Sequence, residues 1–475
     1  DINAKPISLS GSKVYDASAT AASSALTISG TVGGQTLTLS GNGTLSAGAD
    51  AGTNKTINTS GLTLGNGSGG TAGVATNYSL VGGTYQMTVT QRPVTISGSR
   101  FYDSTTTVNS SDISVFTNRV GGQTLSITGS GTVATAVAGS GKTVTLGTLT
   151  LADGTGSASN YSLASGTFDI NSRQVNIAGS RIYDGTTTVN GSDLVITTGV
   201  GSEVLTVNGT GSIANANVAS NKSVTAGTLA LSSASGNASN YSMGTITLTV
   251  TQRPINVDLE KTYDATTDAS AGDLKSNGIT NTVLGHSLTL NGTGTMSNTS
   301  VGIGKSVSVG TLSVSGAQSS NYTLVGGTHT IDVNPRTTNA SGTRHYDGTT
   351  IAGSSAFSTF SNSVGGDTIT LSGTGSIASA GVGSKGVTIG SLQSAHPNYI
   401  LGNATLTVTK RPVNLSGRRI RGGTTDILAS ELSFGNLAAS ETLTLTGQGT
   451  IPVIRVGSHA LNLFTLSMGN GSGST

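Results

Sequence analysis

Cysteine and tryptophan are absent from this sequence of 475 residues, and charged residues make up only 9% of it. Without cysteine there can be no disulfide, no thiolate metal site and no cysteine nucleophile. The net charge of +2 is close to neutral for this length, and no basic stripe follows the chain, so nucleic acid is not expected as a partner. No apolar run reaches about 18 residues, so we expect no membrane insertion.

Proline and aromatic residues are also scarce, with 7 prolines and 4% aromatics. The low proline content argues against a proline-rich disordered linker. Hydrophobic residues reach 34%, which is below the average for globular domains, while glycine occurs 70 times. Several small cores fit this composition better than one large core.

Two residue pairs recur along the chain with a step of roughly eighty residues, which is the mark of an internal repeat. The first is a tyrosine–aspartate pair, at Tyr15-Asp16, Tyr102-Asp103, Tyr183-Asp184, Tyr263-Asp264 and Tyr346-Asp347. The second is an asparagine–tyrosine pair, at Asn77-Tyr78, Asn160-Tyr161, Asn240-Tyr241, Asn321-Tyr322 and Asn398-Tyr399. Of the 11 tyrosines, only Tyr85 lies outside these two positions.

Between the two pairs, each full copy also carries a glycine-rich turn followed by a lysine, at Lys55, Lys142, Lys222, Lys305 and Lys385. A basic residue precedes each tyrosine–aspartate pair by two positions, and a basic or proline-bearing joint closes each copy. We therefore predict six repeats, at residues 1–92, 93–173, 174–253, 254–336, 337–411 and 412–475. The sixth is degenerate and incomplete, because Arg421, Gly422 and His459 stand at the tyrosine, aspartate and lysine positions. Both ends lie inside the pattern, as expected of a segment of a longer chain.

Apolar and hydroxyl residues alternate with a period of two, as in Thr124-Leu125-Ser126-Ile127, which is typical of half-buried β-strands. Glycine pairs such as Gly121-Gly122 precede these strands and indicate turns. The one helical signal is a short turn near Asp268–Leu274. The expected fold is all-β, a linear tandem array of small immunoglobulin-like β-sandwich modules. The alternatives are β-grasp modules, with a short helix crossing a sheet, and a continuous β-solenoid.

The third copy resembles the YDG-type repeat domain of large bacterial surface proteins, which include filamentous-haemagglutinin-like adhesins. The resemblance rests on Arg181-Ile-Tyr-Asp-Gly-Thr-Thr187, Gly209-Thr-Gly-Ser-Ile213, Lys222 and Asn240-Tyr241, and comparable landmarks cover nearly the whole chain. Three copies depart from it, with Ala17, Ser104 and Ala265 at the glycine position. The resemblance implies export, an extracellular or cell-surface location and a stalk or adhesive role.

The repeated tyrosines are expected to pack in the core while their hydroxyls find polar partners. The aspartates are expected to cap turns or pair with basic residues. Copy six loses tyrosine, aspartate and lysine together, which suggests contact between these positions, such as a lysine–aspartate ion pair. A sharper hypothesis is a lysine–asparagine isopeptide cross-link, which would lower the intact mass by one ammonia per bond.

No constellation supports catalysis, and we predict no enzyme activity, cofactor or metal site. Residues 136–143 match a relaxed phosphate-loop pattern, but a strand rather than a helix follows them, so nucleotide binding is not expected. The five histidines share no register in the repeat.

The expected function is therefore a structural stalk or spacer of a secreted bacterial adhesin, supporting cell adhesion or biofilm. Neighbouring modules of the same chain are the expected partners. A binding module for a surface glycan or a host or matrix protein is one alternative. The other is a filament subunit that associates head to tail, with the incomplete sixth module accepting a strand.

Overall fold

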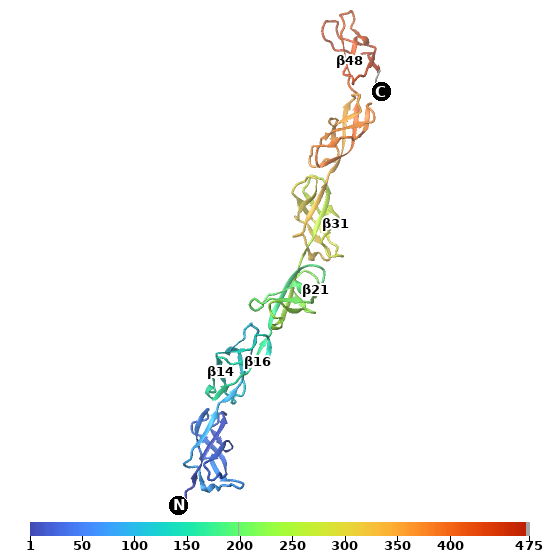
Figure 1. Cartoon of the computed structure of the whole chain (residues 1–475). Coiled ribbons are helices and arrows are strands. Elements are labelled where there is room, and N and C mark those ends of the chain that lie inside the picture. The colour runs from blue at the N-terminus through green and yellow to red at the C-terminus, as the bar shows by residue number, and fades with distance from the viewer. Residues whose placement is uncertain (198, 472–475) are drawn as a thin grey trace. The chain divides into compact units, whose positions relative to one another are not determined.

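The computed structural model describes residues 1–197 and 199–471, and in this part of the chain it contains strands and 3-10 turns but no α-helix. The predicted all-β tandem array is confirmed. The chain divides into two compact units, one of residues 1–181 with 186–250 and one of residues 182–185 with 251–475. No helix among the described residues is long and apolar enough to cross a membrane. Each repeat forms its own group of strands, coloured in sequence order in Figure 1.

The second repeat shows the plan of a module. Its elements are β10 (Arg92–Val94), β11 (Ile96–Phe101), β12 (Thr107–Asn109), η3 (Ser110–Asp112), β13 (Ile113–Phe116), β14 (Leu125–Thr128), β15 (Ser130–Val133), β16 (Gly139–Thr145), β17 (Thr150–Asp153), η4 (Ala158–Asn160), β18 (Tyr161–Leu163) and β19 (Thr167–Asn171). Six of these strands form one sheet in the order β12-β15-β16-β19-β11-β13, and β14 pairs with β17 in a second sheet.

The first and last strands of each complete module lie side by side. In the second repeat β11 runs parallel to β19, with Ser97 opposite Thr167 and Phe101 opposite Asn171. The first strands of the other modules are β2 (Ser8–Val14), β20 (Arg173–Ile182), β29 (Asn256–Thr262) and β38 (Arg336–His345). The last strands are β9 (Tyr85–Thr90), β27 (Tyr241–Thr251), β37 (His329–Asn334) and β45 (Tyr399–Thr409). This parallel pair distinguishes the module from a wholly antiparallel sandwich.

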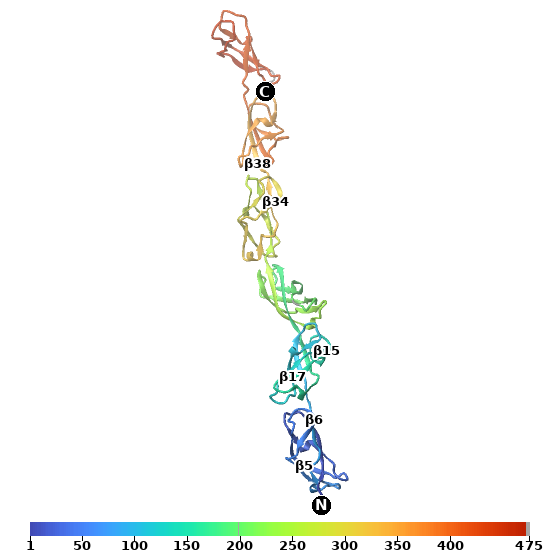
Figure 2. The ribbon, with the colours of Figure 1, turned by 90° about the vertical axis from the view of Figure 1, so that its left-hand side faces the viewer.

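Alternating side chains of these strands build a small core in each module. In the second repeat Phe168 and Ile170 of β19 are buried against Ile96 of β11 and Ile127 of β14, so the two sheets share one apolar interior. The outward positions carry threonine, serine and other polar residues, as the period of two requires. Figure 2 shows β15 and β17 of this repeat from a second direction.

The helical signal after the fourth tyrosine–aspartate pair is a 3-10 turn, η7 (Ala271–Asp273), which follows β30 (Asp268–Ser270). The Asp273 side chain accepts a hydrogen bond from the Ser270 amide and so closes the turn. Turns of this size occur at the same place in all six repeats. The longer crossing helix of the β-grasp alternative is absent from the described residues.

The sixth repeat is built from three two-stranded sheets among its described residues. They are β46 (Asn414–Gly417) with β48 (Leu432–Gly435), β47 (Asp426–Leu428) with β50 (Gln448–Thr450), and β49 (Leu443–Thr446) with β51 (Ser467–Asn470). Through residue 471, no strand takes the place that β19 has in the second repeat.

Candidate functional site

The tyrosine–aspartate pair lies in a turn directly after the first strand of each module. Asp16 Oδ1 accepts hydrogen bonds from the Ser18 amide and from Lys13 Nζ, both at 2.9 Å. Burial works to raise the pKa of Asp16, but the bonds from Lys13 and Ser18 outweigh it and the pKa is lowered. The same basic residue pairs with the aspartate in three other repeats, as Arg100–Asp103, Lys261–Asp264 and Arg344–Asp347.

The residue after the aspartate has a left-handed backbone in all five copies. Gly185 and Gly348 have φ of 78° and 77°, and Ala17, Ser104 and Ala265 have φ of 58°, 67° and 63°. Glycine suits this conformation because it has no Cβ to clash with the neighbouring carbonyl. The three non-glycine copies are therefore strained at this residue.

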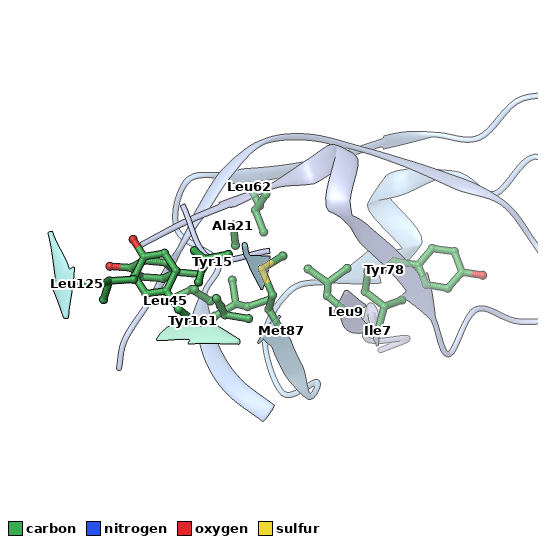
Figure 3. Packing of buried hydrophobic residues seen from close by; sticks show 13 residues of the cluster. Ile7, Leu9, Tyr15, Ala21, Leu45, Leu62, Tyr78, Met87, Leu125 and Tyr161 are labelled. Atoms are coloured by element: carbon green, nitrogen blue, oxygen red, sulfur yellow. The ribbon is translucent and has the colours of Figure 1, made fainter. Parts of the chain in front are cut away.

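In the first four repeats, the tyrosine of the tyrosine–aspartate pair projects out of its own module and packs against the tyrosine of the next asparagine–tyrosine pair. The Tyr15 and Tyr161 rings lie edge to face with centroids 5.4 Å apart, and both are buried in one cluster with Leu125. Figure 3 shows Tyr15, Tyr161 and Leu125 together at one end of the first core, with Tyr78 at the other end. Equivalent edge-to-face pairs are Tyr102–Tyr241, Tyr183–Tyr322 and Tyr263–Tyr399. We call these four arrangements the tyrosine joints.

A single polar side chain, here called the bridging residue, lies at each joint and contacts one or both of the tyrosine hydroxyls. Gln123 Nε2 donates to the Tyr15 hydroxyl at 2.9 Å, while the Tyr161 hydroxyl donates to Gln123 Oε1. The Val120 amide donates to the Tyr161 hydroxyl at 3.1 Å and so fixes where that hydroxyl directs its own proton. The bridging glutamine is thereby held by one tyrosine from each module.

Carboxylates take the bridging position in two joints. Tyr102 donates to Glu203 Oε1 at 2.5 Å, and Tyr241 donates to Glu203 Oε2. Tyr263 and Tyr399 both donate to Asp367 Oδ2 at 2.9 Å, and His396 Nε2 lies 3.9 Å from the other oxygen. A carboxylate only accepts, so both tyrosines serve as donors here, whereas Tyr15 is an acceptor at the glutamine joint.

Histidine occupies the bridging position in the fourth repeat. His286 Nδ1 lies 2.7 Å from the Tyr322 hydroxyl, which also accepts from the Val283 amide at 3.0 Å. The imidazole thus lies within hydrogen-bonding distance of this hydroxyl, and either atom of the pair can be the donor. The Tyr183 ring packs against the same imidazole, with centroids 6.0 Å apart.

The carboxylate joints change the acidity of their tyrosines. Burial, followed by the Glu203 hydrogen bond and charge, raises the pKa of Tyr102 to about 12. Burial and Glu203 likewise raise the pKa of Tyr241, and burial and Asp367 raise those of Tyr263 and Tyr399. The pKa of Tyr346 is raised mainly by its hydrogen bond to Glu441 of the sixth repeat. A phenolate beside a carboxylate is disfavoured, so these joints favour neutral tyrosine.

The asparagine of the asparagine–tyrosine pair makes a second connection between modules. Asn160 Oδ1 accepts from the Ala51 amide at 2.7 Å, and its Nδ2 donates to Asp50 Oδ1 at 2.8 Å. Asn240 accepts from the Ala138 amide and Asn398 from the Val301 amide in the same way. These asparagines are buried and bonded, whereas Asn77 of the first repeat is exposed.

The repeated lysine supports the loop that the asparagine contacts. Lys55 Nζ donates to the Asp50 carbonyl at 2.5 Å, and Lys305 Nζ donates to the Ser300 carbonyl at 2.5 Å. Lys222 bonds to Asn215 and Asn217, and Lys142 to Thr135. Lys385 makes no hydrogen bond or ion pair within the described part of the chain. The ion partners of Asp16, Asp103, Asp264 and Asp347 are the basic residues of the first strand, not these lysines. The cross-link between lysine and asparagine stays a prediction that intact mass can test.

An arginine at the start of a module ties the joint backbone together. Arg92 donates to the Tyr15 carbonyl at 3.3 Å, to the Asn118 carbonyl at 2.6 Å and to Asn118 Oδ1 at 2.8 Å. Asn118 has a left-handed φ of 59°, which presents both oxygens to the guanidinium. Arg253 with Tyr183 and Asn281, and Arg411 with Tyr346 and Asn436, repeat this arrangement.

The bridging residues escaped the sequence reasoning because their identity changes from copy to copy. Each lies directly after the turn of its repeat that Gly121-Gly122 forms in the second repeat. They are Gln35, Gln123, Glu203, His286, Asp367 and Glu441. The signal that could have found them is chemical, since all six side chains offer an acceptor at one aligned position. His286 carries no repeat signal in the sequence, because no other repeat has histidine at this position.

The joints contain no arrangement suited to hold a metal, and no group of three metal-ligating side chains occurs elsewhere among the described residues. A family model described as the YDG domain matches the chain five times, at residues 2–88, 84–168, 170–248, 247–331 and 329–408. A comparison with curated proteins finds no match.

Proposed function

The chain belongs to the YDG domain family, with five tandem copies of the domain, and on this premise we propose that it is a structural spacer in a secreted bacterial surface adhesin. In this role the modules separate an adhesive or effector region from the cell and transmit tension along the chain. Extracellular location and support of adhesion or biofilm belong to the same proposal. The observation that carries it is the pairing of first and last strands within each module.

This pairing supports a role under tension. Because β11 and β19 are parallel neighbours, the start of β11 and the end of β19 lie at opposite ends of their shared ladder. Force applied through the chain therefore slides one strand along the other and loads all their hydrogen bonds together. Separating them sideways would break the same bonds one at a time. A module built this way resists pulling from its termini more than pulling across the sheet.

The joints support the same role. Short connections place Arg92 directly after the last strand of the first repeat, and this residue holds both modules through backbone carbonyls. Tyrosine rings, one polar bridge and one buried asparagine then add contacts to the same joint. Such contacts link each module to its neighbour without a disulfide, in a chain that has no cysteine.

Single-molecule stretching of the whole chain tests the proposal. We expect separate unfolding steps, each equal to the extended length of about eighty residues, roughly 260–290 Å, less the end-to-end length of the folded module. Because the chain lacks cysteine, the pair Ser97→Cys and Thr167→Cys provides unique handles at register partners of β11 and β19 for pulling across the sheet. The proposal expects a clearly lower unfolding force for that geometry. Equal forces in the two geometries would contradict it.

A further inference from the structure

The face of the first repeat that carries Asn77 and Tyr78 has the chemistry of a tyrosine joint. The Tyr78 hydroxyl donates to Gln35 Oε1 at 2.5 Å and accepts from the Val32 amide at 3.0 Å. Tyr161, Gln123 and Val120 make the same contacts in the second repeat. Gln35 Nε2 and the Asn77 side chain have no partner within the described part of the chain, although their counterparts Gln123 and Asn160 bind the preceding module.

A hollow lies beside Gln35 at the position that a tyrosine ring takes in the joints. Its volume is about 290 Å³, and apolar side chains of Leu26, Ile28, Leu37 and Leu39 line it with Gln35. Counting from the glycine pair, Leu37 corresponds to Leu125, and the strand register matches Ile28 with Phe116. Leu125 is buried in the cluster with Tyr15, whereas Leu37 is only half-buried. Val32 is 56% exposed, whereas its counterpart Val120 is half-buried.

We propose that this face, formed by Gln35, Leu37, Asn77 and Tyr78, is a docking site for the tyrosine–aspartate end of another YDG module. The incoming tyrosine ring fills the hollow and its hydroxyl accepts from Gln35 Nε2, as Tyr15 accepts from Gln123. A backbone amide of the partner's loop donates to Asn77, as the Ala51 amide donates to Asn160. This inference rests on the proposed role of the joints as links between modules.

The partner is a module with a free tyrosine–aspartate end, and not a second copy of this chain. Four of the chain's own five tyrosine–aspartate ends are engaged with a second tyrosine, and Tyr346 bonds to Glu441. The sixth repeat offers Arg421 and Gly422 at these positions. An arginine there cannot fill an apolar hollow without burying an unpaired charge. The docking is therefore directional.

The test joins an extra copy of residues 93–172 in front of residues 5–475, so that Asn171-Ser172 runs into Lys5-Pro6 as it normally runs into Arg173. Amide hydrogen exchange is followed in segments 30–37 and 74–79, which occur only once in this chain. Burying a tyrosine ring and adding two hydrogen bonds is expected to slow exchange there roughly tenfold or more. The control carries Tyr102→Ala in the added copy alone, and should exchange like the chain without the addition.

A second variant keeps the test decisive if the altered copy folds poorly. Gln35→Ala removes a partly buried side chain that accepts from Tyr78 and is proposed to donate to the incoming tyrosine. It leaves the added copy unchanged and should abolish the added protection. Equal exchange in the extended chain and in both variants would overturn the proposal. Self-association of the unextended chain through its first repeat, seen by sedimentation, would overturn the choice of partner. Val200 has a joint amide that is present once in every variant, because it donates to the Tyr241 hydroxyl. Loss of protection at Val200 would instead show that the tyrosine joints within the chain do not form.

Discussion

At the scale of single residues, the joint works because a tyrosine hydroxyl can both donate and accept. The hydroxyl of the asparagine–tyrosine pair accepts from a backbone amide in all five copies. It donates to Gln123, Glu203 and Asp367, and it lies within hydrogen-bonding distance of His286 Nδ1. The hydroxyl of the tyrosine–aspartate pair then adapts to the bridging residue, accepting from glutamine and donating to a carboxylate. One frame thus tolerates several bridging residues.

Replacing the bridging carboxylate should change the acidity of both tyrosines that it contacts. Glu203→Gln removes a charge next to Tyr102 and is expected to lower its pKa from about 12, leaving the contribution of burial. The same change should lower the pKa of Tyr241, which Glu203 also raises. Spectrophotometric titration of tyrosinate, with NMR assignment of the rings, measures both. Unchanged titration of both tyrosines in this variant would show that the bridging contacts do not form.

The same shift sets the alkaline limit of this joint. A pKa raised above its unfolded value favours folding while tyrosine is neutral, so the contribution is fully present below pH about 10. It is lost as the pH rises toward about 12, where Tyr102 ionises in the folded chain. Glu203→Gln should therefore lose less joint stability over this interval than the native chain.

A second prediction at this scale concerns the strained turn. Ser104→Gly replaces a serine with φ of 67° and should stabilise the second repeat by about 0.5–1 kcal/mol, because glycine adopts this backbone without a Cβ clash. Urea unfolding of the full chain measures the change. The matched control is Gly185→Ser, which should destabilise by a similar amount. A destabilising Ser104→Gly would mean that the serine side chain outweighs the strain.

At the scale of elements, the strands followed from the alternating pattern, but their arrangement did not. The alternation at Thr124–Ile127 predicted a strand, and the structure has β14 there. The parallel pairing of β11 with β19 joins residues about seventy positions apart, and alternation along one strand carries no information about its neighbour. The tyrosines were expected within cores, and they lie in cores that extend across the joints. The bridging residues could not be found by identity, because glutamine, glutamate, aspartate and histidine can all supply the hydrogen-bond acceptor at this position.

One glycine of the first strand shows how close the strands approach. A Cβ at Gly179 would lie 1.9 Å from the Asp193 carbonyl oxygen, and Gly11, Gly98, Gly342 and Gly417 are as tightly placed. The fourth repeat has Leu259 at this position, and the crowded glycine is instead Gly278 of the partner strand β31 (Leu274–Thr280).

Gly179→Ala should therefore destabilise the third repeat by about 1–3 kcal/mol, the usual cost of forcing extra volume into a packed site. Gly201→Ala is a useful comparison, because a Cβ there meets nothing within 4 Å although its φ of 58° adds strain. Thermal unfolding should show the larger loss for Gly179→Ala. A cost at Gly179 no greater than at Gly201 would contradict the close approach of the strands.

At the scale of the whole molecule, the tyrosine joints couple neighbouring modules within each of the two compact units. Each joint uses a tyrosine from one repeat and an asparagine, a tyrosine and a bridging residue from the next, so no module forms it alone. Stability should then depend on neighbours, as in other repeat proteins. The two units are alike in this respect, since each contains complete tyrosine joints.

The most direct measurement is amide hydrogen exchange in the second repeat after Tyr15→Ala in the first. The account predicts that exchange at Val120 and Gln123 rises roughly tenfold or more, because the ring and hydroxyl of Tyr15 cover the bridging residue. The control is Tyr85→Ala, which removes the one tyrosine outside the repeat frame and should leave Val120 and Gln123 protected. Unchanged exchange at Val120 and Gln123 in the Tyr15→Ala chain would contradict the coupling of modules through their tyrosines.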